Sequence, residues 1–263
     1  NHAQAYEHTD MEYRQFQEHP QFKEELPMSY KLCLANLIGK SHSVKNTERF
    51  LELIEELKDL PVSSFNEEGE VFQNIYFSEH LHYINTGEFD KAEALVPAIE
   101  KGLITYRNKI NKARVLTFQY NIMIMYFLMH RFKDALLWTN VILEDKSEIK
   151  EGVKDVSRIL LPIIHFELGH HDLVENLTRS AYRYLLKKKK IHRFEKMLIN
   201  YLREMPLSTD RDEFKTSLEN FKDQLVQLTE DPNEAMAYGM EEMGLWVKSR
   251  LTGRQMSELI LDL

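Results

Sequence analysis

The chain has 263 residues, a formal net charge of −8 and a pI near 5.8. Hydrophobic residues make up 43% and charged residues 29%, a balance that excludes a disordered chain. The acidic charge argues against nucleic acid as a partner, because binding to phosphate backbones relies on an excess of Lys and Arg. With 9 Gly and 7 Pro the chain has too few turn residues for an all-β fold, so we expect an all-α protein.

The single cysteine and the apolar runs restrict the class further. Cys33 excludes an intrachain disulfide and a cysteine-based metal cluster, and its apolar setting predicts a buried packing thiol rather than a reactive one. The best candidate for a membrane span, residues 122–129, is far shorter than the roughly 18 apolar residues that a span needs. The start, NHAQAYEHTD, lacks the apolar core of a signal peptide. We therefore expect a cytoplasmic protein that does not contact a membrane.

The spacing of apolar residues predicts helices from the N-terminus onward. The first predicted helix, residues 1–19, is polar, and Pro20 and Pro27 break the chain after it. A buried helix at 28–37 follows, and then a helix that Thr47 caps.

The rest of the chain continues in the same way, with polar loops at 41–46 and 62–69. Pro97 should either kink its helix or displace the start of that helix, and the sequence leaves both open. The further predicted helices are 71–85, a helix from 88 that contains Pro97, 109–129, 135–143, 150–168, 173–186, 191–203, 211–229 and 233–250.

Three tight turns share one pattern of surrounding residues. Each unit has a ring, then the turn residue, then a second ring, then a small residue. A small residue lets two helices approach closely, and the rings fill the space between them. One such hairpin cannot bury its apolar face alone, so the units are expected to stack. The positions are Tyr83, Gly87, Phe89 and Ala92, then Tyr126, His130, Phe132 and Ala135, then His165, Gly169, His171 and Val174.

At these positions the chain resembles the tetratricopeptide repeat (TPR) family. The first two units match the helix-turn-helix core of that family, and the third keeps Gly169 but has His at both ring positions. The turns are 43 and 39 residues apart, which is longer than the ~34 residues typical of the family, so the chain resembles a long-repeat, divergent member. The resemblance covers about residues 71–186, with a divergent unit at 28–60.

The resemblance implies an all-α, right-handed superhelix of antiparallel helical hairpins. It implies an N-terminal helix and linker at 1–27, a TPR-like repeat domain at 28–206 and C-terminal capping helices at 207–263, joined as one continuous domain. In this family the first helix of each pair lines a concave groove, and such grooves bind peptide segments. The alternative is that many of these side chains pack against further helices of the chain. The expected groove residues are Asn74, Phe77, Leu81, Asn85, Thr117, Tyr120, Ile124 and Leu128.

No residue pattern indicates catalysis, a cofactor or a metal. His80 and His82 lie on different faces of a helix. His165 and His170 could meet across a helix end, but the repeat pattern explains His165 as a packing residue. Glycine-rich phosphate loops and the turn that carries a catalytic serine are absent from the sequence. We therefore expect no enzyme, no cofactor and no bound metal.

Two further stretches have an unremarkable interpretation and a functional one. The basic run Lys187–Lys190 reads as a charged helix end that interacts with the helix dipole, or as a grip for an acidic partner or RNA. The aromatic and Met-rich run at 118–129 reads as the central buried helix, or as the wall of a ligand cavity.

The sequence thus favours a non-catalytic scaffold that binds a protein or a peptide. The alternative is a regulatory or sensor domain of a longer chain, of the peptide-sensing regulator type, whose output segment is absent here. The missing initiator Met is compatible with that alternative. Neither the partner nor the oligomeric state follows from these residues.

Overall fold

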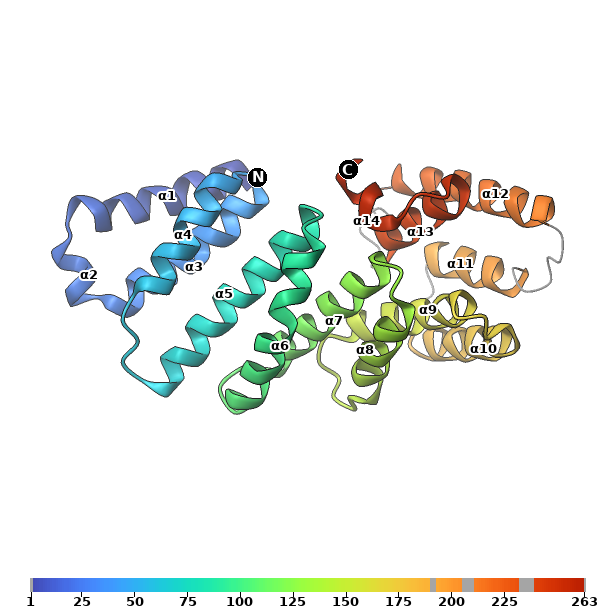
Figure 1. Cartoon of the computed structure of the whole chain (residues 1–263), viewed down its shortest axis with the longest axis horizontal. Helices are drawn as coiled ribbons and strands as arrows, with labels where there is room; N and C mark the ends of the chain where they lie inside the picture. The colour runs from blue at the N-terminus through green and yellow to red at the C-terminus, as the bar shows by residue number, and fades with distance from the viewer. Residues whose placement is uncertain (1, 190–192, 205–210, 232–238, 263) are drawn as a thin grey trace. The chain divides into compact units, whose positions relative to one another are not determined.

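The computed structural model describes residues 2–189, 193–204, 211–231 and 239–262. Over these ranges the chain is all-α, with fourteen α-helices, a short 3₁₀ helix and no strand (Figure 1). Most helices pack against their neighbours in chain order, as helix pairs of a repeat do. None of these helices combines the length and the apolar content that crossing a membrane requires.

The helices begin and end close to the predicted positions. They are α1 (His2–Glu18), α2 (Gln21–Glu25), α3 (Pro27–Ser43), α4 (Thr47–Asp59), α5 (Phe65–Asn85), α6 (Phe89–Thr105), α7 (Lys112–Leu128), α8 (Phe132–Glu144), α9 (Glu151–Glu167), α10 (His171–Lys187), α11 (Arg193–Glu204), α12 (Arg211–Thr229), α13 (Met240–Thr252), α14 (Met256–Leu259) and η2 (Ile260–Asp262).

Several predicted details were wrong. The predicted loop at 41–46 is shorter, because α3 continues to Ser43. Asn46, not Thr47, caps α4: its side-chain oxygen accepts the backbone N–H of Arg49 at 3.2 Å. Helix α5 already begins at Phe65, inside the predicted linker.

Other differences concern Pro97 and the two ends of the chain. Pro97 lies inside α6, so it does not displace the helix start. Helices α2, α14 and η2 were not predicted. The first residues of the helix predicted at 233–250 lie partly outside the described residues, and the described helix α13 runs on to Thr252.

The helices form two compact units. Unit 1 comprises Asn1–Ile84 and Asp90–Arg114, and unit 2 comprises Asn85–Phe89 and Val115–Leu263. The turn between α5 and α6 therefore belongs to unit 2 by its contacts. The domain boundaries expected at 27 and 206 stay predictions.

The predicted turn residues are confirmed by their backbone conformation. Gly87, His130 and Gly169 all have positive φ, at 73°, 57° and 77°. A fourth left-handed residue, Lys45 with φ 57°, lies between α3 and α4 in the divergent unit. Each of the four stands two residues after the end of one helix and two before the start of the next. Four helical hairpins therefore share one turn geometry.

The backbone hydrogen bonds at these turns also repeat. The residue after the left-handed one donates its N–H to the carbonyl five positions earlier: Asn46 to Ser41 at 3.0 Å, and Arg131 to Tyr126 and His170 to His165 at 2.9 Å. This is the bond of a Schellman motif, which satisfies carbonyls left open at a helix C-terminus.

The small residues of the pattern pack as predicted. Ala92, Ala135 and Val174 are fully buried, and the rings of Phe89 and Phe132 are buried beside them. The third unit differs because His171 is exposed, although its ring meets that of Phe166 edge-on with centroids 4.9 Å apart.

Unit 1 has its own hydrophobic core from α1, α3, α4 and α5. Cys33 belongs to it as a buried thiol, as predicted, and burial raises its pKa to about 12. A buried ion pair joins Lys31 of α3 to Glu67 of α5. Hydrogen bonds from Lys31 and Ser63 hold the pKa of Glu67 at about 2, well below its ordinary value.

Replacing Glu67 by Gln should lower the free energy of unfolding by about 3 kcal/mol, because Lys31 would keep a buried charge without its counter-charge. The pKa of Glu67 is lower in the folded chain than in the unfolded chain. The stabilisation by its charged carboxylate should therefore be fully present above pH 4.5 and should be lost as the pH falls from 4.5 toward 2. Urea unfolding at several pH values measures both effects. Glu175→Gln, which breaks an exposed pair with Arg179, is the control and should change stability by less than about 0.5 kcal/mol.

The two turn glycines should respond differently to Ala. Both substitutions cost about 1 kcal/mol for the left-handed conformation. At Gly87 an added Cβ would also lie 2.7 Å from Leu261 Cδ2, whereas nothing lies within 4 Å at Gly169. We therefore expect Gly87→Ala to lower the melting temperature more than Gly169→Ala does. Adding Leu261→Ala to Gly87→Ala should remove the difference, and equal melting temperatures for the two single variants would contradict the close contact.

Candidate functional site

The matching turns define equivalent positions in the four first helices, α3, α5, α7 and α9. The predicted groove residues all stand 13, 10, 6 or 2 positions before a left-handed turn residue. We call these sixteen positions the repeat face. They are Leu32, Ala35, Gly39 and Ser43 in α3, Asn74, Phe77, Leu81 and Asn85 in α5, Thr117, Tyr120, Ile124 and Leu128 in α7, and Val156, Ile159, Ile163 and Glu167 in α9.

In unit 1 the repeat face is accessible. Leu32 is 61% exposed, and Gly39 and Ser43 are also exposed. A Cβ added to Gly39 would meet nothing within 4 Å. Ala35 is half-buried. These α3 residues were not predicted as groove residues, because a lysine at position 45 does not indicate a left-handed turn.

The α5 part of the repeat face is intermediate. The predicted groove residues Asn74, Phe77 and Leu81 are half-buried, and the Arg114 guanidinium lies 4.3 Å from the centroid of the Phe77 ring. Asn85, the last residue of α5, is exposed and belongs to unit 2.

In unit 2 the repeat face is largely buried. Ile124 is 7% exposed and Leu128 2%, while Thr117 and Tyr120 are half-buried. The three apolar positions of α9, Val156, Ile159 and Ile163, are buried. Accessibility of equivalent positions therefore falls from α3 to α9.

Helix α13 covers part of this face in unit 2. The Tyr120 hydroxyl of α7 donates to Glu242 Oε1 of α13 at 2.9 Å. Burial raises the pKa of the Glu242 carboxyl, and this hydrogen bond opposes the rise. Just before α13, a Cβ at Gly239 would lie 3.1 Å from Val156 Cγ1 of α9. The C-terminal part of the chain thus contacts Tyr120, one of the predicted groove residues, and approaches Val156 at an equivalent position of α9.

Glu167 of α9 holds the second half of α13. The Trp246 indole N–H donates to Glu167 Oε1 at 2.7 Å, and Arg250 forms an ion pair with Glu167 Oε2 at 3.5 Å. Trp246 is buried and meets the Tyr201 ring edge-on. The carboxylate therefore binds two side chains one helical turn apart.

The segment after α13 contacts the turns of two earlier hairpins. The backbone N–H of Met256 donates to His130 Nε2 at 3.2 Å, so this nitrogen carries no proton. Leu261 of η2 packs on Gly87. Because burial lowers the pKa of His130, its neutral form is favoured.

Charge is nearly absent from the repeat face. Charged residues make up 29% of the chain, yet Glu167 is the one charged residue at these sixteen positions. The accessible positions of α3 and α5 carry apolar, amide, hydroxyl or glycine groups. Such a face suits a neutral or apolar partner rather than a charged one.

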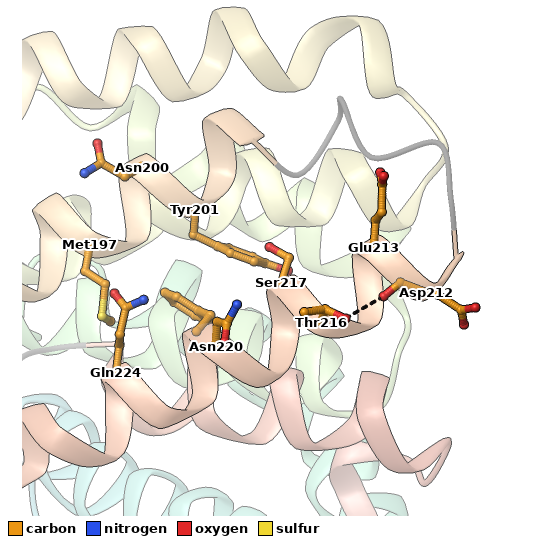
Figure 2. Close-up of a pocket in the computed structure, with 10 residues that line it drawn as sticks. Met197, Asn200, Tyr201, Asp212, Glu213, Thr216, Ser217, Asn220 and Gln224 are labelled. Carbon is orange, nitrogen blue, oxygen red and sulfur yellow. Dashed lines mark hydrogen bonds between the residues drawn. The ribbon is translucent and has the colours of Figure 1, made fainter.

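A separate pocket of about 700 Å³, which was not predicted, lies between α11 and α12 (Figure 2). The rings of Tyr201 and Phe221 are stacked with centroids 4.3 Å apart. Figure 2 shows the Tyr201 ring reaching from α11 toward Ser217 of α12. The lining is Met197, Asn200, Tyr201, Asp212, Glu213, Thr216, Ser217, Asn220, Phe221 and Gln224.

Most of the lining residues that the structure describes are polar, and none of these is a His, Cys, Lys or Arg. Asp212 and Glu213 stand in the first turn of α12, where carboxylates interact favourably with the helix dipole. Burial raises the pKa of Tyr201, so its hydroxyl stays protonated. The described residues of this pocket could hold a small polar molecule but provide no histidine or cysteine for covalent catalysis.

His80 and His82 lie in separate surroundings, as the sequence predicted. The His82 ring stacks on Phe50 with centroids 4.4 Å apart, whereas His80 is fully buried in α5. His165 and His170 do meet, with their Nδ1 atoms 3.1 Å apart. Within the described ranges, no three His, Cys, Asp or Glu side chains are grouped so that they could hold a metal ion.

The basic run and the aromatic and Met-rich run, each of which had two interpretations, both make contacts within the chain. In the basic run, Lys188 forms an ion pair with Glu151, and the nearby Arg193 pairs with Asp231 at 3.1 Å. Lys190 and His192 lie outside the described residues. The aromatic and Met-rich run is buried in α7 from Asn121 to Leu128.

Searches of protein-family models, of curated proteins and of solved structures returned no match to this chain. The helical hairpins and their common turn therefore stand without a family assignment.

The stability of the chain should depend on pH through His80. Burial lowers its pKa to about 4, from 6.5. Between these values the unfolded chain binds a proton that the folded chain does not, so the free energy of unfolding should fall as the pH drops from 6.5 to 4, by about 3 kcal/mol for this residue.

Chemical unfolding of the wild type and of His80→Leu at pH 7 and pH 5 isolates this effect. Burial also lowers the pKa values of His42, His130 and His165, so some pH dependence should remain in the variant. Equal pH dependence in the two proteins would contradict the assignment to His80.

Proposed function

We propose that this chain is a non-catalytic scaffold that binds a protein or peptide partner on the repeat face of α3 and α5 in unit 1. One observation carries the proposal. Helix α13 contacts the repeat face of unit 2 at Tyr120 and Glu167, whereas three of the four repeat-face positions of α3 are exposed and the fourth is half-buried. An uncharged, partly apolar face on a soluble helix pair is the kind of surface that a partner covers.

The proposal extends to the arrangement of the hairpins. The four matching turns support a TPR-like array, and we propose that its hairpins follow one another in a right-handed superhelix. Repeat arrays of this kind offer their first helices to extended or helical segments of other proteins. The chemistry of the pocket between α11 and α12 gives no reason to add an enzymatic role.

A random-peptide display library selected on the intact chain tests this proposal. Leu32→Glu and Gly39→Glu each place a charge on the exposed repeat face of α3, and neither side chain enters the core. We expect selected peptides to bind each variant at least about tenfold more weakly, a loss of about 1.4 kcal/mol, in isothermal titration calorimetry.

Leu186→Glu and Val226→Glu are the matched controls. Both side chains are 55% exposed, and both lie in unit 2, away from the repeat face. Circular dichroism and thermal unfolding should show that all four variants are folded. If the selected peptides bind all four variants as tightly as the wild type, the partner site is not the repeat face of α3.

A further inference from the structure

Helix α13 shows which kind of segment the repeat face receives within this chain. Its contacting side chains are spaced four residues apart: Glu242 meets Tyr120, and Trp246 and Arg250 both meet Glu167. A spacing of four places side chains on one face of a helix. A single helix thus contacts two first helices, α7 and α9, with one stripe of side chains.

Close approach is part of this contact. Gly239 precedes α13 with φ 86°, and a Cβ there would crowd Val156 of the α9 repeat face. The lack of a side chain lets the incoming backbone lie near the first helix. A glycine just before the helix therefore lets the start of α13 approach Val156 closely.

Helices α3 and α5 present a comparable pair within unit 1. Lys31 of α3 pairs with Glu67 of α5, and further along both helices the His42 and His82 rings meet with centroids 5.7 Å apart. These two contacts occur in the same order along the two helices, so α3 and α5 run parallel and side by side. Unit 1 thus has two parallel first helices.

The side chains of this pair suit an apolar helix. Leu32 is an exposed apolar side chain on α3, and Leu81 is a half-buried one on α5. Ala35 and Gly39 supply small residues on the receiving side, with open space at Gly39. A helix with an apolar stripe could therefore approach α3 closely and contact Leu81.

The charges on α13 show that this occupant differs from α13 itself. Its Arg250 requires the carboxylate of Glu167, and its Glu242 requires the Tyr120 hydroxyl. At the equivalent positions α3 has Ser43 and Ala35, which offer neither group. A second copy of α13 would lose both contacts on α3.

We infer that the partner segment for α3 and α5 is an amphipathic α-helix of another protein, with an uncharged apolar stripe of i, i+3/i+4, i+7 spacing against Leu32 and Leu81. This inference rests on the proposed function, because it names the partner that the repeat face of unit 1 binds. The helix-in-groove mode of peptide recognition uses the same spacing of anchor residues.

The peptides selected on the intact chain supply the test. We expect them to gain helical circular dichroism when bound, and a proline in the middle of each should weaken binding at least tenfold while a proline in the first turn should not. Raising NaCl from 0.05 to 0.5 M should change Kd by less than about threefold, because no ion pair contributes.

Gly39 supplies a steric test that does not depend on charge. Gly39→Leu should weaken peptide binding at least tenfold by holding the incoming helix away, whereas Gly39→Ala should change it by less than about threefold. Thermal unfolding of both variants should show that the fold is kept, since a Cβ at this position meets nothing.

The outcomes separate the two proposals. Peptides that lose binding with Leu32→Glu but stay extended and tolerate a central proline would overturn the helical partner and keep the proposed function. Peptides that ignore Leu32→Glu would overturn the proposed function itself. Concentration-dependent dimers in sedimentation, lost with Leu32→Glu, would identify a second copy of this chain as the occupant and overturn the inference.

Discussion

A left-handed residue between two helices determines how four described hairpins of this chain are built, and in three of them the next N–H bonds to the carbonyl five residues back. Helices end two residues before Lys45, Gly87, His130 and Gly169 and begin again two residues after them. Because a helix rotates by a fixed angle per residue, a fixed end also fixes which side chains share a face. The repeat face follows from the turn, not from any one side chain.

Equivalent repeat positions have different contacts in the two units. On α7 and α9 they are joined to α13 through a hydroxyl, an indole and a guanidinium, and on α3 they are open. Burying a carboxylate such as Glu167 is tolerated because Trp246 and Arg250 satisfy its oxygens. Where the position holds Ser43, no such anchor exists. The residue type at one equivalent position, Glu167 in α9 and Ser43 in α3, thus decides whether a first helix can bind α13 there.

Local patterns predicted most of the helices, since apolar spacing and turn residues act over a few positions. The turn at His130 was predicted by alignment with Gly87 and Gly169, and the turn residue Lys45 was missed because its side chain gives no backbone signal. The cover that α13 provides could not be predicted, since Tyr120 and Glu242 are 122 residues apart and neither is unusual in its own helix. Register alone placed the expected groove residues on the first helices, and it could not tell accessible positions from covered ones. Their role in binding a partner stays a prediction.

The contact between His130 and Met256 spans 126 residues, and it gives unit 2 a property that open repeat arrays lack. In a repeat array whose hairpins contact only their neighbours, each hairpin can complete its packing as soon as the next hairpin has formed. Here α13 follows α7 and α9 in the chain, so both first helices leave the exit tunnel before the helix that covers them is made. During that interval the apolar face of α9 is available to chaperones or to other nascent chains. The interval before α13 is made is therefore the time when the repeat face of α9 is most exposed to aggregation.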